Sequence, residues 1–354
     1  MTGDDKNFGG VLDWDQLQQW VAVQDLPGRG PLTGATELLG GSQNKIFLLE
    51  REGAKMVLRR PPMHLRANSN KTMLREAQVL KALSGSGVPH PDFLAVCEDT
   101  DVIGACFYIM EPIVGFTPRG ELPGRYGTDA SWRRRMTEEL VAGAAKLGSV
   151  DPSNVGLDGF GKPDHWVERQ VERWRSQLKS YSDLPGYDKP ELPGFETVAE
   201  WLDANRPDDY KIGIIHGDFQ WANVMYAYDE PKLAALVDWE LSSLGDPLLD
   251  LAWILTSWGE PHDPPGHQLQ VEPWLDFPSR SELVQLYGEL TGRDMSVMPW
   301  YFALACYKLG VILEGSWARA LSGQADMEMG QRLHETSLWL FAKAEQLTTQ
   351  GEAL

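Results

Sequence analysis

The chain has 354 residues, of which 42% are hydrophobic and 23% are charged. This length favours two domains over a single core, and the composition is typical of a soluble globular protein. The formal net charge of −19 excludes nucleic acid as an expected partner, because a phosphate backbone requires a basic surface.

Signals for membranes and export are missing from the sequence as given. It contains no apolar run of about 18 residues, which a transmembrane helix requires. Its first residues have neither the basic start nor the apolar segment of a signal peptide. The three cysteines, Cys97, Cys106 and Cys306, are too few and too scattered to predict a disulfide framework or a zinc site. We therefore expect a cytoplasmic protein with reduced thiols and no membrane partner.

The first third of the chain has the pattern of a small sheet with one packed helix. We expect a short amphipathic helix over 13–24 and a Gly/Pro-rich loop over 25–35. Strands are expected over 36–50, as two short strands around a Gly-Gly turn, and over 54–60, 93–99 and 102–111. A helix over 69–83 lies between them. Three strands, a helix and two strands predict a mixed sheet.

The pattern becomes mainly helical after residue 112. Helices are expected over 131–147, 165–181, 195–205, 247–258, 280–291, 297–321 and 325–349, with one β-rich interruption over 212–238. A small sheet domain followed by a larger helical one predicts an α+β protein with two lobes. The expected domains are residues 1–112 and 113–354, with a hinge over 110–116.

The strongest local signal is HGDFQWANVM, which runs from His216 to Met225 directly after the apolar strand 212–215. Four residues separate Asp218 from Asn223, and a second apolar strand then ends at Asp238. We expect these three polar side chains to lie close together at the mouth of a short hairpin.

These side-chain types suit phosphoryl transfer. One carboxylate must accept the proton of an acceptor hydroxyl, while an amide oxygen and a second carboxylate hold Mg²⁺ against the phosphates. An Asp and an Asn with four residues between them, and another Asp 15 positions after the Asn, match the catalytic loop and the metal-binding Asp of kinases. The sequence therefore predicts a reaction that uses Mg²⁺ and ATP, or another nucleoside triphosphate.

This motif, together with LVDWELSSLGDPLLDLAWIL over 236–255, resembles the aminoglycoside phosphotransferase and choline kinase superfamily. It is most similar to the branch related to acyl-CoA dehydrogenases, and the resemblance extends over 33–350. It implies a two-lobed protein-kinase-like fold, with a nucleotide-binding N-terminal lobe and a helical C-terminal lobe that carries the acceptor site. It also implies that Asp218 is the catalytic base, that His216 organises the catalytic loop, and that Asn223 and Asp238 bind Mg²⁺.

One face of the strand over 54–60 should point toward the nucleotide. Strand alternation places Lys55, Val57 and Arg59 on that side and Arg60 on the other. The family register then puts Arg59 where a phosphate-binding lysine is usual, and Val57 against adenine. Arginine can pair with phosphates, but an arginine that only stabilises the fold is the alternative.

Other nucleotide contacts are implied by the resemblance alone. Glu76 matches the helix glutamate that pairs with the strand cation. Backbone groups over 110–113, those of Glu111 and Ile113 among them, would contact adenine. Backbone amides at Gly41, Ser42 and Asn44 could approach phosphates, although an ordinary hairpin turn has the same composition.

The region after the motif supplies support and an acceptor site. The family pattern makes Asp250 structural, accepting hydrogen bonds from the catalytic-loop backbone, while Asp246 caps the helix that starts at Pro247. The helix 165–181 and the Pro-rich loop 259–279 are the expected walls of the acceptor site.

Three functions are compatible with the sequence. The leading one is a kinase of a small hydroxylated compound, such as an aminoglycoside, a choline-like amine, a sugar or a hydroxyacyl compound. A nucleotide-binding pseudokinase that serves as an interaction module is favoured only by Arg59 in place of lysine. A protein kinase is disfavoured because seven residues separate Asp238 from Asp246, too few for the segment that binds substrate peptides.

Overall fold

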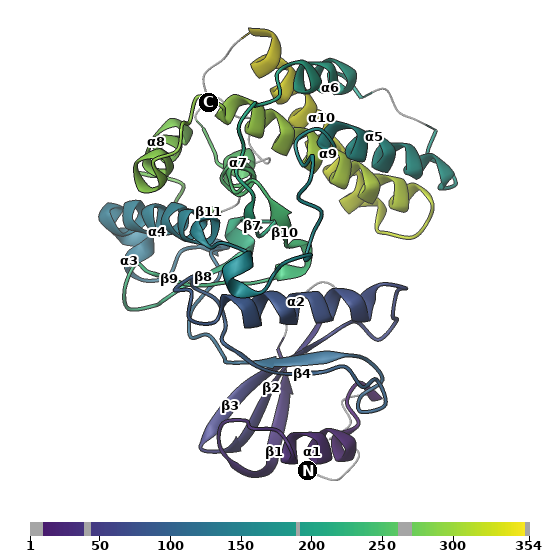
Figure 1. Cartoon of the computed structure of the whole chain (residues 1–354), viewed down its shortest axis with the longest axis vertical. Coiled ribbons are helices and arrows are strands. Elements are labelled where there is room, and N and C mark those ends of the chain that lie inside the picture. The colour runs from purple at the N-terminus through teal and green to yellow at the C-terminus, as the bar shows by residue number, and fades with distance from the viewer. Residues whose placement is uncertain (1–9, 39–43, 189–191, 261–270, 351–354) are drawn as a thin grey trace.

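The structure is a computed structural model that describes residues 10–38, 44–188, 192–260 and 271–350. Two lobes are evident in Figure 1. The N-lobe holds a five-stranded sheet with α1 and α2, and the C-lobe holds the elements from β6 onward. The predicted α+β, two-lobed fold is confirmed.

The N-lobe sheet contains strands β1 to β5. Their bounds are Arg29–Glu37, Lys45–Glu52, Ala54–Arg60, Phe93–Cys97 and Phe107–Met110. Their order is β1-β2-β3-β5-β4, and every pairing is antiparallel. The sequence analysis expected a mixed sheet, and that expectation was wrong.

Two local expectations in this lobe were wrong. The loop expected over 25–35 gives way to β1 from Arg29 onward. This strand tolerates its Gly and Pro residues because it lies at the sheet edge, where a missing N–H breaks no ladder. At the other side of the sheet, residues 102–106 form a turn, so β5 starts only at Phe107.

The two faces of the sheet have different partners. One face, with Met56 and Leu58 of β3, packs in a core shared with α1 (Trp14–Ala22). The opposite face, with Tyr108 of β5, packs toward α2 (Ser69–Leu83) and the C-lobe core. Figure 1 shows α2 along the boundary between the lobes. The odd-numbered residues of β3 therefore face the C-lobe.

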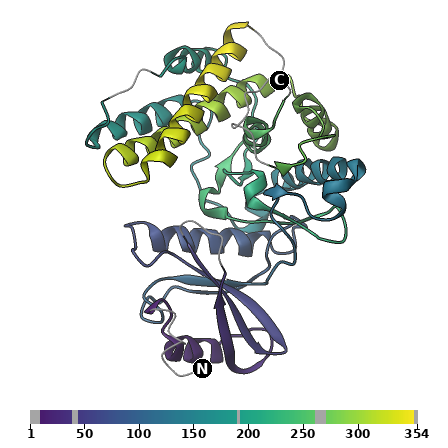
Figure 2. The ribbon, with the colours of Figure 1, turned by 180° about the vertical axis from the view of Figure 1, so that it is seen from behind.

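Eight helices occur in the described part of the C-lobe. Their bounds, from α3 to α10, are Arg125–Thr128, Ala130–Ser149, Gln170–Ser180, Phe195–Ala204, Leu248–Ser257, Arg280–Thr291, Met298–Leu321 and Met327–Gln350. The last two pack side by side along their length (Figure 2). Helix α5 begins at Gln170 and not at residue 165, because residues 164–169 form turns and His165 has a positive φ of 50°, which a right-handed helix excludes.

Short strand pairs carry the catalytic motif. Strand β7 (Gly213–Ile215) pairs with β10 (Ser243–Gly245), and β8 (Val224–Tyr226) pairs with β9 (Leu233–Leu236). Strands β6 (Gly120–Glu121) and β11 (Val271–Glu272) form a third, parallel pair. The sequence analysis anticipated β-structure over 212–238 but neither β10 nor the β6–β11 pair.

The lobes are joined by an extended segment and by side-chain contacts. The predicted domain boundary, after residue 112, lies in the segment that follows β5. Phe116 and Tyr226 then exchange two backbone hydrogen bonds of 2.9 Å each, which fixes the end of this segment to β8. Arg75 of α2 donates to the carbonyl of Phe160, at 2.8 Å. None of the described helices is long and apolar enough to cross a membrane.

Candidate active site

The motif that runs from His216 to Met225 begins in a backbone bend at Gly217, where only glycine fits. Gly217 has a φ of +84°, and a Cβ there would overlap the carbonyl oxygen of Leu241. The amides of His216 and Gly217 both donate to the carboxylate of Asp250, at 2.7 and 2.9 Å. Burial raises the pKa of Asp250. Asp250 thus fixes the loop backbone by accepting these two hydrogen bonds, as the sequence analysis anticipated.

His216 links the two halves of the motif. It is fully buried, with Nε2 3.0 Å from the carbonyl of Val237 and Nδ1 3.4 Å from the amide of Asp218. This arrangement requires the proton on Nε2. Since the ring is buried, its contacts fit the expected role of loop organiser and leave no surface for a substrate.

The carboxylate of Asp218 is held by three donors. Gln220 Nε2 and Trp253 Nε1 each donate to Oδ1 at 2.8 Å, and Asn223 Nδ2 donates to Oδ2 at 2.7 Å. Each carboxylate oxygen can accept about two hydrogen bonds. Oδ1 is therefore fully used, whereas Oδ2 keeps one position for another donor.

Asn223 and Asp238 lie at the same end of the β8–β9 hairpin. The amide of Val237 donates to the carbonyl of Asn223 at 2.9 Å, which ties the two segments together. Asn223 Nδ2 also donates to the carbonyl of Asp218, so its side-chain oxygen points away from Asp218. Asp238 adopts a left-handed φ of 69°, rare for a residue with a side chain. It turns a partly exposed carboxylate toward the N-lobe.

This donor set fits a hard cation. An amide oxygen and a carboxylate oxygen are ligands that Mg²⁺ prefers. Across the described ranges, no group of three or more His, Cys, Asp or Glu side chains is arranged to hold a metal. A Mg²⁺ ion between Asn223 and Asp238 would therefore need phosphate and water oxygens to complete its octahedron.

Arg59 connects β3, α2 and the hairpin. Its Nε lies 3.0 Å from Glu76 Oε2, and its Nη2 lies 2.5 Å from Asp238 Oδ1. The hydroxyl of Tyr108 also donates to Glu76 Oε2 at 3.0 Å. The pairing of Arg59 with Glu76 is the one that the resemblance implied.

Burial and charge shape this cluster. Burial alone lowers the pKa of Arg59, but the negative charges of Glu76 and Asp238 outweigh it, so the pKa is raised and the guanidinium stays charged. Burial raises the pKa of Glu76 to about 7, although Arg59 opposes the shift. The cation is thus permanent, whereas the Glu76 carboxylate is easily protonated.

Arg60 points to the opposite side of β3. It is buried and donates to the carbonyls of Val11 and Ile103, the latter at 3.1 Å. These contacts tie the segment before α1 to the turn before β5. The strand alternation that separates Arg59 from Arg60 is therefore as the sequence predicted.

The structure describes only some of the other residues that were predicted to contact the nucleotide. Gly41 and Ser42 lie outside the described residues, and Asn44 directly precedes β2. Val57 is buried and pairs across the sheet with Met110. The amide of Glu111 donates to Asp92 O at 2.9 Å, so only its carbonyl is open to a ligand.

Sequence reasoning missed residues that surround the predicted ones. Gln220 and Glu240 each lie two positions after a predicted site residue, Asp218 and Asp238. This closeness in sequence is the only signal that could have identified them. Burial and the neighbouring Asp238 raise the pKa of Glu240. Trp253 of α7 and Lys308 of α9 contact the loop because the tertiary fold brings these helices to it. No sequence pattern near either residue indicates this contact.

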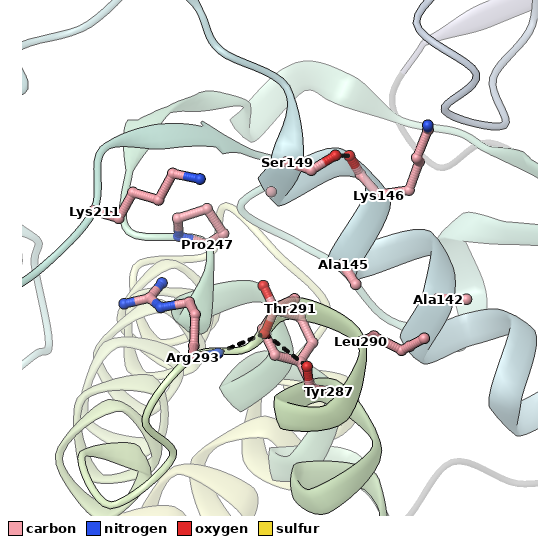
Figure 3. A pocket seen from close by; sticks show the side chains of 11 residues that line it. Ala142, Ala145, Lys146, Ser149, Lys211, Pro247, Tyr287, Leu290, Thr291 and Arg293 are labelled. Atoms are coloured by element: carbon pink, nitrogen blue, oxygen red, sulfur yellow. Dashed lines mark hydrogen bonds between the residues drawn. The ribbon is translucent and has the colours of Figure 1, made fainter.

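Two cavities in the C-lobe lie away from these residues. One, of about 330 Å³, opens between α4 and α8 and contains none of the predicted site residues. Figure 3 shows Tyr287 and Leu290 facing Ala145 across it. The other, of about 540 Å³, is lined by α5 and by Ser243 and Leu244 of β10. Helix α5 lies within 165–181, one of the two segments that the sequence analysis proposed as walls of the acceptor site.

Known proteins are similar to this chain in sequence and in fold. The family described as the phosphotransferase enzyme family (APH) matches residues 34–283. Acyl-CoA dehydrogenase family member 10 of Mus musculus is 30% identical over 311 residues, which cover 85% of this chain and 28% of that protein. Acyl-CoA dehydrogenase family member 11 of Gallus gallus is 32% identical, with 81% of this chain and 37% of that protein covered. The chain therefore spans well under half the length of these curated relatives.

A solved structure covers nearly the whole chain. A protein of Ralstonia eutropha JMP134, described among the aminoglycoside phosphotransferases, is 29% identical with a TM-score of 0.79, and the match covers 94% of this chain and 98% of that one. The kinase-like arrangement of the two lobes is shared along the whole match.

Proposed function

Because this chain belongs to the phosphotransferase enzyme family, we propose that it transfers the γ-phosphoryl group of ATP, with Mg²⁺, to a hydroxyl group of a small molecule. The observation that carries the proposal is the convergence of Asp218, Asn223, Asp238 and Arg59 at the boundary between the lobes. These are the base, the metal ligands and the phosphate-binding cation that phosphoryl transfer needs.

Asp218 is the base in this proposal. Its Oδ2 has one open acceptor position, and it takes the proton of the acceptor hydroxyl as that oxygen attacks phosphorus. The donors from Gln220 and Trp253 fix the plane of the carboxylate, so that the open position keeps one direction. Such fixed geometry accounts for much of the rate gain in phosphoryl transfer.

Asn223 and Asp238 would hold Mg²⁺ through their side-chain oxygens. The ion supplies charge neutralisation for the phosphates of the nucleotide. Arg59, held by Glu76 on one side, presents its guanidinium to the same phosphates. Arginine serves this purpose well because its planar fork pairs with two phosphate oxygens.

The non-catalytic alternative has little support. It relied on the absence of the usual lysine from β3. Arg59 occupies that place with a permanent positive charge, and it forms the ion pair with Glu76 that the lysine usually forms. All three acidic and amide groups of the motif are also present. We therefore favour an active enzyme over an interaction module.

Substitutions of the two neighbouring arginines should have separable effects. We expect Arg59→Ala to lower kcat/KM for ATP more than Arg60→Ala, because only Arg59 faces the proposed phosphate site. Arg60→Ala should mainly lower the free energy of unfolding, by about 1–3 kcal/mol for each charged hydrogen bond that it loses. Steady-state kinetics and thermal unfolding of both variants test this. The reverse order in kcat/KM would exclude Arg59 from the nucleotide site.

The fold favours a small acceptor over a protein. The residues between Asp238 and Asp246 are taken up by a 3-10 turn, Trp239–Leu241, and by β10, which pairs with β7. No length remains for a platform that binds peptides. Helix α5 instead lines a cavity beside β10. The similarity to acyl-CoA dehydrogenase family members makes hydroxyacyl compounds an early choice for testing, with amino alcohols, sugars and aminoglycosides.

We expect labelled ATP to transfer phosphate to a compound in a small-metabolite extract and not to a peptide library. Fractions that gain label would be analysed for the mass of one added phosphate. The Asp218→Asn variant serves as the matched blank, since it should bind nucleotide without transfer. Stoichiometric labelling of peptides, with no labelled metabolite, would refute the proposed acceptor class.

A further inference from the structure

We propose that Lys308 is a positioning residue for the loop that carries Asp218. It donates a hydrogen bond to the Gly217 carbonyl, and it supports the Trp253 ring that donates to the Asp218 carboxylate. The proposal rests on the assignment of Asp218 as the base. Lys308 lies on α9, 90 residues after Asp218, and no sequence motif points to it.

The direct contact is a hydrogen bond to the peptide that joins Gly217 to Asp218. Lys308 Nζ donates to the carbonyl of Gly217 at 2.9 Å, while the amide of Gly217 donates to Asp250 Oδ1 at 2.9 Å. Both backbone polar groups of Gly217 are therefore bound by buried side chains of opposite charge. This clamp fixes the backbone immediately before the base.

The second contact passes through an indole ring. Lys308 Nζ lies 4.1 Å from the centroid of the Trp253 ring, a distance typical of a cation–π interaction. The Nε1–H of the same ring donates to Asp218 Oδ1. One ammonium group thus supports both the backbone and the carboxylate of the proposed base.

A buried lysine is costly unless it serves a purpose that an apolar side chain cannot. Only 7% of Lys308 is exposed, and moving an ammonium group out of water carries a large penalty. A well-packed hydrophobic residue often stabilises a protein more than a buried ion pair does. A neutral donor could hold the Gly217 carbonyl, but only a cation also balances the charge of the buried Asp250 carboxylate, so its place at the loop explains its presence.

Charged groups from three elements face Lys308. Burial lowers the pKa of Lys308 to about 8, Asp250 of α7 and Asp218 of the loop oppose the shift, and Arg173 of α5 adds to it. The aromatic faces of Trp253 and Trp174 are nearby as well. The side chain is therefore charged at neutral pH and loses its charge at mildly alkaline pH, where the clamp should weaken.

The test compares the pH profiles of three variants. Lys308→Met should lower kcat at pH 7 by up to about 100-fold, as expected for a displaced catalytic group, with KM for ATP little changed. Lys308→Arg should keep most of kcat because its charge does not titrate. The wild-type decline in kcat above about pH 8 should be absent from both variants. Lys343→Met is the matched control, since Lys343 also lies over an aromatic ring, that of Trp339, but far along the chain on α10.

Two kinetic outcomes overturn the proposal. One is a Lys308→Met variant with wild-type kcat. The other is a decline at the same pH in Lys308→Arg as in the wild type. If Lys308→Met does not fold, the pH profile of Lys308→Arg decides alone.

Hydrogen exchange separates this proposal from the proposed function. Exchange of the segment 213–223 in the nucleotide-free protein should be faster in Lys308→Met than in the wild type and in Lys343→Met. Unchanged exchange overturns the clamp whether or not phosphate transfer occurs. Faster exchange in a protein that transfers no phosphate supports the clamp and refutes only the phosphotransferase assignment.

Discussion

Asp218→Asn should keep the fold and lose about 10²- to 10⁴-fold in kcat, the usual contribution of a general base. The amide has the size of the carboxylate and can still accept from Gln220 and Trp253. It cannot take up the proton of an acceptor hydroxyl at neutral pH. Nucleotide binding should be retained, so the loss should appear in kcat.

A side effect of this substitution is predictable from the structure. The new amide group would face Asn223 Nδ2, which donates to Oδ2 in the wild type, so Asn223 must rotate. Titration with Mg²⁺ shows how much of the loss comes from that rotation. Asp208→Asn, an exposed site in the same lobe, controls for the general effect of an added amide. A variant that keeps more than about half of kcat would exclude Asp218 as the base.

Asp238→Ala and Asn223→Ala should each raise the Mg²⁺ concentration needed for half-maximal activity. Each removes an oxygen ligand from a cation that demands nearly ideal geometry. Losses of a single electrostatic group at a reacting centre are commonly about 10²- to 10³-fold in kcat. In the presence of a chelator, the affinity for ATP should change little in Asn223→Ala. The affinity for ATP should not fall in Asp238→Ala either, because Asp238 no longer competes with the phosphates for Arg59.

The matched control lies on the same hairpin. Glu230→Ala removes an exposed acid at the opposite end of β8 and β9, where Glu230 pairs only weakly with Lys232, at 3.8 Å. It should leave the Mg²⁺ dependence unchanged. Unchanged half-saturation in both Asp238→Ala and Asn223→Ala would mean that the metal is held elsewhere.

Much of the fold was predictable because local patterns determine it. The apolar spacing predicted α2 and α8 with the bounds that the structure has. Alternation along β3 correctly separated Arg59 from Arg60, since side chains on a strand must point to opposite faces. The order of the motif predicted that Asp218, Asn223 and Asp238 would converge. These features depend on near neighbours in sequence.

The missed features depend on distant neighbours. Strand β10 has only three residues, and it forms because β7 offers it an edge. Helix α5 starts late because residues 164–169 form turns, with a left-handed φ at His165. Trp253 reaches Asp218, and Lys308 reaches the neighbouring Gly217, from helices whose residues lie 35 and 90 positions after Asp218 in the sequence. No periodicity within a segment reports such contacts.

The ion pair between Arg59 and Asp238 has a consequence for the sequence of binding events. The charge of Asp238 is balanced by Arg59, so under the proposed assignment free Mg²⁺ would be attracted less strongly to the Asp238 carboxylate. A nucleotide that brings its own Mg²⁺ offers both side chains a new partner at once, phosphate for Arg59 and metal for Asp238. Under that assignment, the pair favours the arrival of metal and nucleotide as one unit.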